Sequence, residues 1–205
     1  MEWTVFCLAN HYDVQDKLRE EIESVLGGSS FTLDAGPQMP YLQAVILESM
    51  RFGPFAPIPP PRRATQRAYI DGFDIPEGTT IFTNMHVCTR DAEFFPDAAV
   101  FRPERFLERT WEPISGSSTD FAPFSVGPRM CPGSQLAMLN ISTIICMLLQ
   151  NYKVTFSRAA SNCTYHAYLQ LVRPTDALID ATVSSGLVAS PTPAAAIKVR
   201  LLGEI

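Results

Sequence analysis

Apolar residues recur every three or four positions in three stretches of the chain. Across Trp3–Leu26 they share one face while charged residues occupy the other, which predicts an amphipathic helix, or two with a break near Asn10 and His11. Tyr41–Arg51 repeats this pattern and predicts another helix. Gly133–Asn151 is apolar on nearly every side, which is typical of a helix buried in a core.

Shorter apolar runs bounded by turn residues predict strands. Ala68–Ile70 and Phe73–Ile75 flank an Asp-Gly turn and predict a hairpin, and Thr79–Met85 predicts a third strand of the same small sheet. Later strands are predicted at Tyr152–Phe156, Tyr165–Val172 and Ile197–Leu202. The pattern as a whole indicates a mainly α protein with small β-sheets.

Two stretches in the middle of the chain have little periodicity. Residues 54–61 contain five of the 17 prolines and predict an extended path, because proline fixes φ and lacks the amide donor. Residues 89–123 predict an ordered meander, since their aromatic side chains and that of the following Phe124 need burial. These aromatic residues are Phe94, Phe95, Phe101, Phe106, Trp111, Phe121 and Phe124.

Composition narrows the class of protein. The 205 residues are 46% hydrophobic and 18% charged, with a net charge of −5, which excludes a disordered chain and argues against a nucleic-acid partner. An odd number of cysteines, five, and the lack of a secretory leader favour a reducing compartment. No apolar stretch is as long as a membrane-spanning helix requires.

The signatures of several common sites are absent from the sequence. There is no CxxC pair, HExxH, GxSxG or phosphate-binding GxxxxGK, so structural zinc, metalloprotease, serine hydrolase and P-loop hypotheses lose their support. The remaining candidate is FSVGPRMCPG, residues 124–133, directly before the apolar helix.

Cys131 lies at the expected entry of this helix, where unpaired amides and the helix dipole favour a thiolate. Gly127 and Gly133 allow the backbone to turn tightly and to approach a flat ligand, and Arg129 suits a carboxylate on that ligand. Phe124 offers an aromatic wall. The alternative is a buried structural cysteine near a helix cap, which is the commoner fate of an isolated cysteine.

Residues 124–133 match the F-x-x-G-x-R-x-C-x-G pattern of cytochromes P450 at every fixed position, and the chain resembles that family. The resemblance implies haem b, iron protoporphyrin IX, with Cys131 as the axial thiolate ligand of iron and Arg129 as a partner of a haem propionate. Phe124, Gly127 and Gly133 would belong to the same cofactor site. The implied activity is insertion of one oxygen atom from O2 into a lipophilic organic substrate.

The resemblance extends to two further motifs. Glu48-Ser49-Met50-Arg51 is similar to the family's E-x-x-R, and Pro103-Glu104-Arg105-Phe106 to its P-E-R-F segment. The resemblance implies that Glu48, Arg51 and Arg105 form a buried structural charge triad that holds the meander against the core. Taken alone, an i, i+3 pair is more often a surface pair worth roughly 0.2–0.5 kcal/mol.

Resemblance also suggests further contacts. Arg62, after the proline turn, fits a second propionate-binding position. Substrate contacts are suggested for Phe55, Ala56, Ile58 and Leu187, although ordinary turn packing is an equal alternative for the first three.

The match runs over residues 1–205, which we interpret as a partial P450 domain, the C-terminal haem-binding half of the cytochrome P450 fold. The family's N-terminal half carries the distal helix that serves oxygen activation, so we identify no catalytic residue and expect a truncated enzyme. The alternative is a non-catalytic P450 fragment or pseudoenzyme; a peroxide-using or isomerising enzyme also stays open.

The resemblance implies an NADPH-dependent, electron-donating reductase and a small lipophilic substrate as partners, with no nucleic acid. We expect membrane contact only through an N-terminal anchor outside this chain. The expected location is the reducing cytosolic side, at the endoplasmic reticulum membrane for a full-length form.

Overall fold

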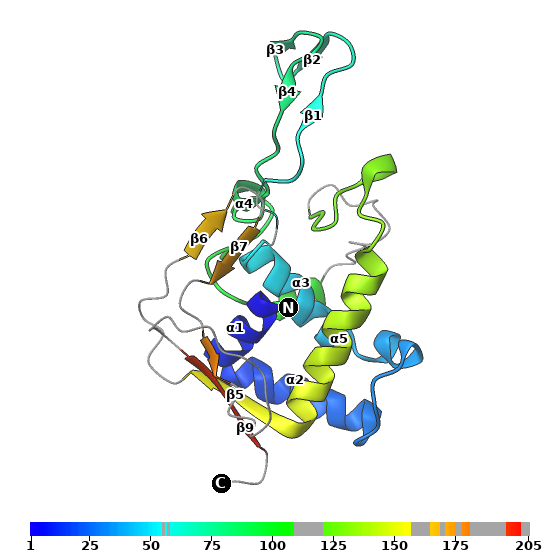
Figure 1. Cartoon of the computed structure of the whole chain (residues 1–205), viewed down its shortest axis with the longest axis vertical. Helices are drawn as coiled ribbons and strands as arrows, with labels where there is room; N and C mark the ends of the chain where they lie inside the picture. The colour runs from blue at the N-terminus through cyan, green and yellow to red at the C-terminus, as the bar shows by residue number, and fades with distance from the viewer. Residues whose placement is uncertain are drawn as a thin grey trace.

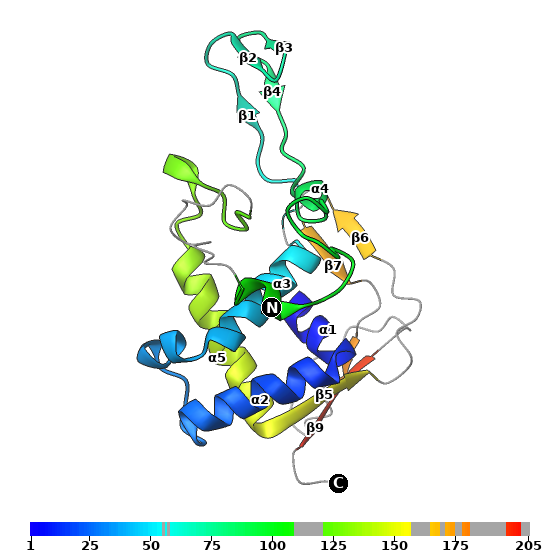
Figure 2. The ribbon, with the colours of Figure 1, turned by 180° about the vertical axis from the view of Figure 1, so that it is seen from behind.

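The computed structural model describes residues 1–54, 56, 58–108 and 121–156, together with the backbone of the strands at 165–168, 171–174, 178–180 and 196–201. Helices form the body of the protein, small sheets lie at its edges, and one long hairpin projects away from it (Figures 1 and 2). This arrangement confirms the prediction of a mainly α fold with small β-sheets.

The three predicted helical stretches are helical, and the break in the first is at His11. The long helices are α1 Glu2–Asn10, α2 Tyr12–Leu26, α3 Pro40–Phe52 and α5 Ser134–Asn151. Shorter helical segments are η1 Leu33–Gln38, α4 Met85–Cys88, η2 Pro103–Phe106 and η3 Gly127–Arg129.

One apolar core joins the four long helices and strand β5, Tyr152–Phe156. It forms because each helix turns its apolar side inward, and α1 is buried over most of its length. A smaller cluster, Ala44, Leu47, Phe95, Phe106 and Phe121, packs α3 against the meander.

The burial predicted for the whole circumference of α5 is wrong for one side. Leu136, Ile144 and Met147 are exposed, whereas Met138, Ile145 and Leu149 are buried. These exposed residues lie at i, i+8 and i+11, so they share a face of the helix. When a helix is apolar on nearly every side, its sequence does not show which side packs against the rest of the chain.

Two polar side chains of α2 tie the helices together. Buried Gln15 donates to the carbonyls of Leu8 (3.0 Å) and Val154 (2.9 Å) and accepts from the Val154 amide (2.9 Å), so it pairs with β5 as a neighbouring strand would. Glu21 accepts from the amides of Tyr41 and Leu42 at 2.8 Å each, which caps the N-terminus of α3.

The predicted hairpin is confirmed, and a strand does lie within Thr79–Met85, but its length and the sheet it joins differ from the prediction. Strands β2 Ala68–Ile70 and β3 Phe73–Ile75 pair antiparallel, whereas β4 spans only Thr80–Ile81 and pairs with β1, Arg62–Arg63. The ladder is short because Pro61 lacks an amide donor before β1. The chain then turns into α4, whose first turn is capped by Asn84 accepting from the Val87 amide at 3.2 Å.

Strand β5 has the predicted bounds and pairs antiparallel with β9, Ala196–Leu201, which itself pairs parallel with β8, Leu178–Asp180. The single strand predicted at Tyr165–Val172 is wrong. The segment forms two antiparallel strands, β6 Tyr165–Tyr168 and β7 Leu171–Pro174, because a strand needs a paired neighbour and this segment supplies its own.

Burial of the meander aromatics is confirmed for Phe95, Phe101, Phe106 and Phe121. Phe94 is 41% exposed, contrary to expectation, because its neighbour Phe95 takes the interior position. Phe124 is half-buried, and Trp111 lies outside the described residues. Within the described part of the chain, no helix is both long and apolar enough to span a membrane.

Candidate functional site

The segment before α5 is a closed turn held by its own backbone. The amide of Met130 donates to the carbonyl of Gly127 at 3.0 Å, and the amide of Cys131 donates to the carbonyl of Phe124 at 2.8 Å. Gly127 has φ +70°, a conformation that side chains disfavour, so the turn explains this glycine. We call residues 124–133 the cysteine loop.

The cysteine loop presents Cys131 to solvent beside the N-terminus of α5. Gly133 occupies the N-cap position and, as a glycine, supplies no capping side chain. The uncapped amides and the helix dipole favour negative charge there, which stabilises a thiolate. A Cβ at residue 133 would lie 3.9 Å from the Cys131 sulfur, so the glycine leaves that side of the sulfur open.

The other described cysteines differ from Cys131. Cys7 and Cys146 are buried. Burial, reinforced by the charge of Glu21, raises the pKa of Cys146 to about 12, which keeps that thiol protonated. Cys88 is exposed, but it is the last residue of α4 rather than a residue before a helix N-terminus. Cys163 lies outside the described residues.

Two exposed arginines accompany the cysteine loop. Arg129 lies within it, at the end of η3. Arg62, on β1, donates from Nη2 to Ser125 Oγ at 3.5 Å, which brings the strand to the loop. Ser125 was not expected to contribute, because nothing in its sequence context distinguishes it. Phe124 packs against the main core and anchors the start of the loop.

This donor set fits a flat, anionic metal complex. The exposed sulfur is a soft ligand, the two glycines leave the backbone bare, and the exposed guanidinium groups suit carboxylates on the rim of such a ligand.

Glu48 and Arg51 on α3 meet Arg105 of η2 in a second, buried group. Arg51 Nε lies 2.7 Å from Glu48 Oε2, and Arg105 Nε lies 3.2 Å from Glu48 Oε1. The Glu48 and Arg51 side chains are 0% exposed and that of Arg105 is 5% exposed. The structure thus brings Arg105 of one motif to Glu48 and Arg51 of the other, although the two motifs are far apart in sequence.

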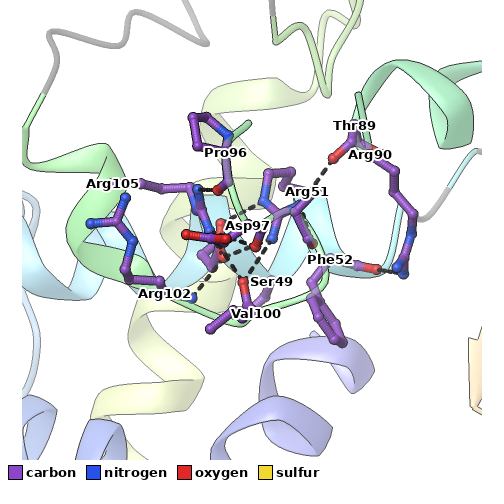
Figure 3. Close-up of polar contacts among 12 residues, drawn as sticks. Ser49, Arg51, Phe52, Thr89, Arg90, Pro96, Asp97, Val100, Arg102 and Arg105 are labelled. Carbon is purple, nitrogen blue, oxygen red and sulfur yellow. Dashed lines mark hydrogen bonds and ion pairs between the residues drawn. The ribbon is translucent and has the colours of Figure 1, made fainter. Parts of the chain in front are cut away.

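The remaining donors of the two arginines hold the meander by its carbonyl oxygens (Figure 3). Arg51 donates to Thr89 and Ala98 at 2.9 Å each, and Arg105 donates to Pro96 at 2.8 Å. Glu48 also accepts from the Arg102 amide at 2.8 Å. Every buried side-chain polar atom in the described residues has a hydrogen-bond partner.

The suggested substrate residues are only partly described. Ala56 is half-buried and Ile58 is 41% exposed, both on the segment that joins α3 to β1. Phe55 and Leu187 lie outside the described residues. Sequence reasoning also missed Arg90, whose Nη2 donates to the carbonyl of Phe52 at 3.0 Å and thereby caps the end of α3.

The sequence model of the cytochrome P450 family matches residues 1–178. The chain belongs to the cytochrome P450 family. Members of this family bind haem, and monooxygenases are among its characterised relatives. Cys131 and the buried group therefore lie in a P450 framework.

Curated P450 relatives are similar over most of this chain. Cytochrome P450 98A1 of Sorghum bicolor is 37% identical over 75% of the chain and 30% of its own length. Flavonoid 3'-monooxygenase of Arabidopsis thaliana is 34% identical over 74% of the chain and 30% of its own length. The chain thus spans about a third of the curated relatives it matches.

A solved structure of a zebra fish cytochrome P450 with abiraterone is also similar. It has a TM-score of 0.75 and 27% identity, over 97% of this chain and 43% of the other.

Proposed function

We propose that the cysteine loop binds haem b, with Cys131 as the axial thiolate ligand of iron and with Arg129 and Arg62 as partners of the propionates. The observation that carries this proposal is the exposed sulfur of Cys131 beside the uncapped N-terminus of α5. Phe124, Gly127 and Gly133 support it, because they set the path of the loop and leave its surface accessible to a flat ligand.

We further propose that the protein is, or contributes to, a haem-thiolate monooxygenase. Haem bound through a thiolate activates O2 so that one oxygen atom can enter an organic substrate. The residues of this chain would keep the sulfur anionic and orient the cofactor by its carboxylates. Ala56 and Ile58, with Phe55 and Leu187, are the proposed contacts of a lipophilic substrate, and a reductase would supply the electrons.

Glu48, Arg51 and Arg105 have a structural role in this proposal. Their side chains are closed to solvent and saturated with internal hydrogen bonds, so they hold the meander on α3 and touch no ligand.

The spectrum of the reduced, carbon-monoxide-bound protein tests the proposed ligand. We expect a thiolate-type spectrum that is lost in Cys131→Ala and kept in Cys88→Ala, which removes the other exposed cysteine of the described residues. A thiolate-type spectrum that survives Cys131→Ala would refute the assignment.

Turnover with a reductase tests the activity separately. A flavonoid is the first substrate class to try, because a curated relative is named flavonoid 3'-monooxygenase. We expect product formation that depends on Cys131 only from a protein that also contains the distal helix of the family's N-terminal half, and none from residues 1–205 by themselves. A thiolate-type spectrum without turnover of any lipophilic substrate would instead support a non-catalytic haem-binding protein.

A further inference from the structure

Trp3 of α1 lies directly over Gly53, the residue that follows α3. A Cβ placed on Gly53 would fall inside the van der Waals envelope of Cδ2, Cε2 and Cε3 of the indole. Trp3 is 8% exposed and also contacts the Phe6 ring, with the centroids 5.6 Å apart, so the indole is enclosed and has little freedom to move aside.

The backbone does not require a glycine at this position. Gly53 has φ −129° and ψ 80°, and a negative φ is open to any residue. The requirement for a bare Cα therefore comes from the indole above it.

Other contacts fix the same end of α3. The Gly53 amide donates to the Ser49 carbonyl at 2.9 Å, and Arg90 donates to the Phe52 carbonyl at 3.0 Å. Pro54, the next residue, is buried. The place where the chain leaves α3 is thus defined by α1, by the meander and by the last turn of the helix itself.

The segment that leaves this point is rich in proline, and its far end meets the cysteine loop. Its sequence, residues 54–61, contains five prolines, and because a proline-rich chain is semi-rigid we expect a displacement at one end to reach the other. At its other end, Arg62 reaches Ser125 of the cysteine loop at 3.5 Å. Ala56 and Ile58, two of the proposed substrate contacts, lie between these anchors.

We propose that Trp3 and Gly53 are positioning residues that set the substrate-side segment 54–61 and thereby determine which ligands fit beside the cofactor. This proposal rests on the proposed haem site, and it assigns specificity rather than cofactor retention to the pair. Neither residue is proposed to touch substrate.

The test compares Gly53→Ala, Trp3→Leu and the double variant in the haem-loaded protein. The probes are imidazole and 1-phenylimidazole, which ligate iron in the same way and differ only by an apolar ring. A misplacement of about 1 Å caused far from the chemistry can slow a reaction about 100-fold; for ligand binding we expect a smaller effect, with each single variant weakening 1-phenylimidazole relative to imidazole by about tenfold. The double variant should recover the original ratio to within about twofold, because removal of the indole makes room for the methyl group.

A readout that needs no haem accompanies the first. We expect hydrogen exchange at the backbone amide of residue 53 to be about tenfold faster in Gly53→Ala than in the unaltered protein, because a displaced helix end opens locally. The double variant should restore the original exchange rate. Gly36→Ala is the matched control, since a Cβ there would lie 3.7 Å from Phe31 Cζ, an ordinary contact. It should change neither readout.

The possible results separate the two proposals. An unchanged affinity ratio, unchanged exchange, or a double variant that adds the two defects would overturn the positioning role. With any of these results, the proposed haem site would still stand if only Cys131→Ala loses the thiolate-type spectrum. If Gly53→Ala does not fold, Trp3→Phe should shift the affinity ratio in the same direction, and a ratio equal to that of the unaltered protein would overturn the proposal.

Discussion

Polar groups lie in opposite environments in two regions of the molecule. They are buried in the group formed by Glu48, Arg51 and Arg105, and they are exposed in the cysteine loop. In the buried group, 0–5% of each side chain is exposed, and two arginines share one carboxylate while binding five backbone carbonyls, those of Thr89, Pro96, Asp97, Ala98 and Val100. In the cysteine loop, Cys131 and Arg129 are exposed, as is Arg62 on neighbouring β1, and backbone hydrogen bonds close the turn.

This difference separates stability from binding. A charge taken out of water destabilises a protein unless its partners remain in place, so the buried group contributes to folding and is closed to ligands. The cysteine loop is held by backbone hydrogen bonds and presents its cysteine to solvent, so its exposed side chains are free to meet a ligand. Mutations in the first region should therefore change stability, and mutations in the second should change ligand binding with little effect on stability.

The largest expected effect is the loss of stability in Glu48→Gln. The neutral amide leaves two buried guanidinium groups without a counter-charge, which should lower the free energy of unfolding by about 3–5 kcal/mol. Urea denaturation at pH 7 measures the change.

Glu108→Gln is the matched control for Glu48→Gln. Its carboxylate pairs with Arg102 at 2.6 Å, but the two side chains are 56% and 40% exposed. An exposed pair contributes less than about 1 kcal/mol, so this variant should be nearly as stable as the unaltered protein. Equal effects of the two variants would contradict the distinction between the regions.

The second prediction concerns coupling within the buried group. Arg51→Met and Arg105→Met should each be destabilising, but the double variant should lose at least about 1 kcal/mol less than the sum, because both arginines serve the same carboxylate. A double-mutant cycle in urea measures this coupling. Additive losses would mean that the two arginines act on the fold independently.

The sequence predicts the long helices well, because a period of 3.6 residues over many turns is a strong local signal. It also identifies the residues of the buried group, since their motifs are recognisable without the fold. Residues such as Gln15 and Glu21 could not be found in this way. Their partners, the backbone of Val154 and of Tyr41, are defined only by tertiary packing.

Strand length was the least predictable property. The run Thr79–Met85 satisfies a strand pattern throughout, yet only Thr80–Ile81 finds a partner, because β1 has just two residues after Pro61. The contact of Trp3 with Gly53 was likewise missed, since an isolated glycine before a proline suggests a turn and gives no sign of a ring packed above it.

The third prediction compares two cysteines. Cys146 is 0% exposed, so Cys146→Ala should lower stability by about 1 kcal/mol through lost packing, whereas Cys131→Ala should stay within about 0.5 kcal/mol. The order should reverse for the thiolate-type spectrum, which only Cys131→Ala should abolish. A Cys131 variant that is strongly destabilised in the haem-free state would show that the loop carries folding energy after all.

The smallest predicted effect on stability concerns Glu104, where a partly exposed residue adjoins a buried one in sequence. Glu104 is adjacent to buried Arg105, but its side chain is 37% exposed, with Lys17 Nζ at 2.7 Å and the Tyr41 hydroxyl donating at 3.1 Å. Partial burial tends to raise the pKa of Glu104, but the hydrogen bond and charge of Lys17, a backbone hydrogen bond and the Tyr41 hydroxyl together hold that pKa below the ordinary 4.5.

A folded-state pKa below the unfolded one means that the folded protein binds fewer protons, so the stability that Glu104 contributes is present above about pH 4.5 and is lost as the pH falls through the folded-state value. Glu104→Gln should therefore be less stable than the unaltered protein at pH 6, by well under about 1 kcal/mol because solvent screens the pair, and the difference should shrink as the pH falls below 4.5. Glu21, whose pKa burial raises, adds the opposite slope in both proteins, so the difference between their urea midpoints isolates Glu104. A difference that widened toward pH 3 would place Glu104 with the buried group instead.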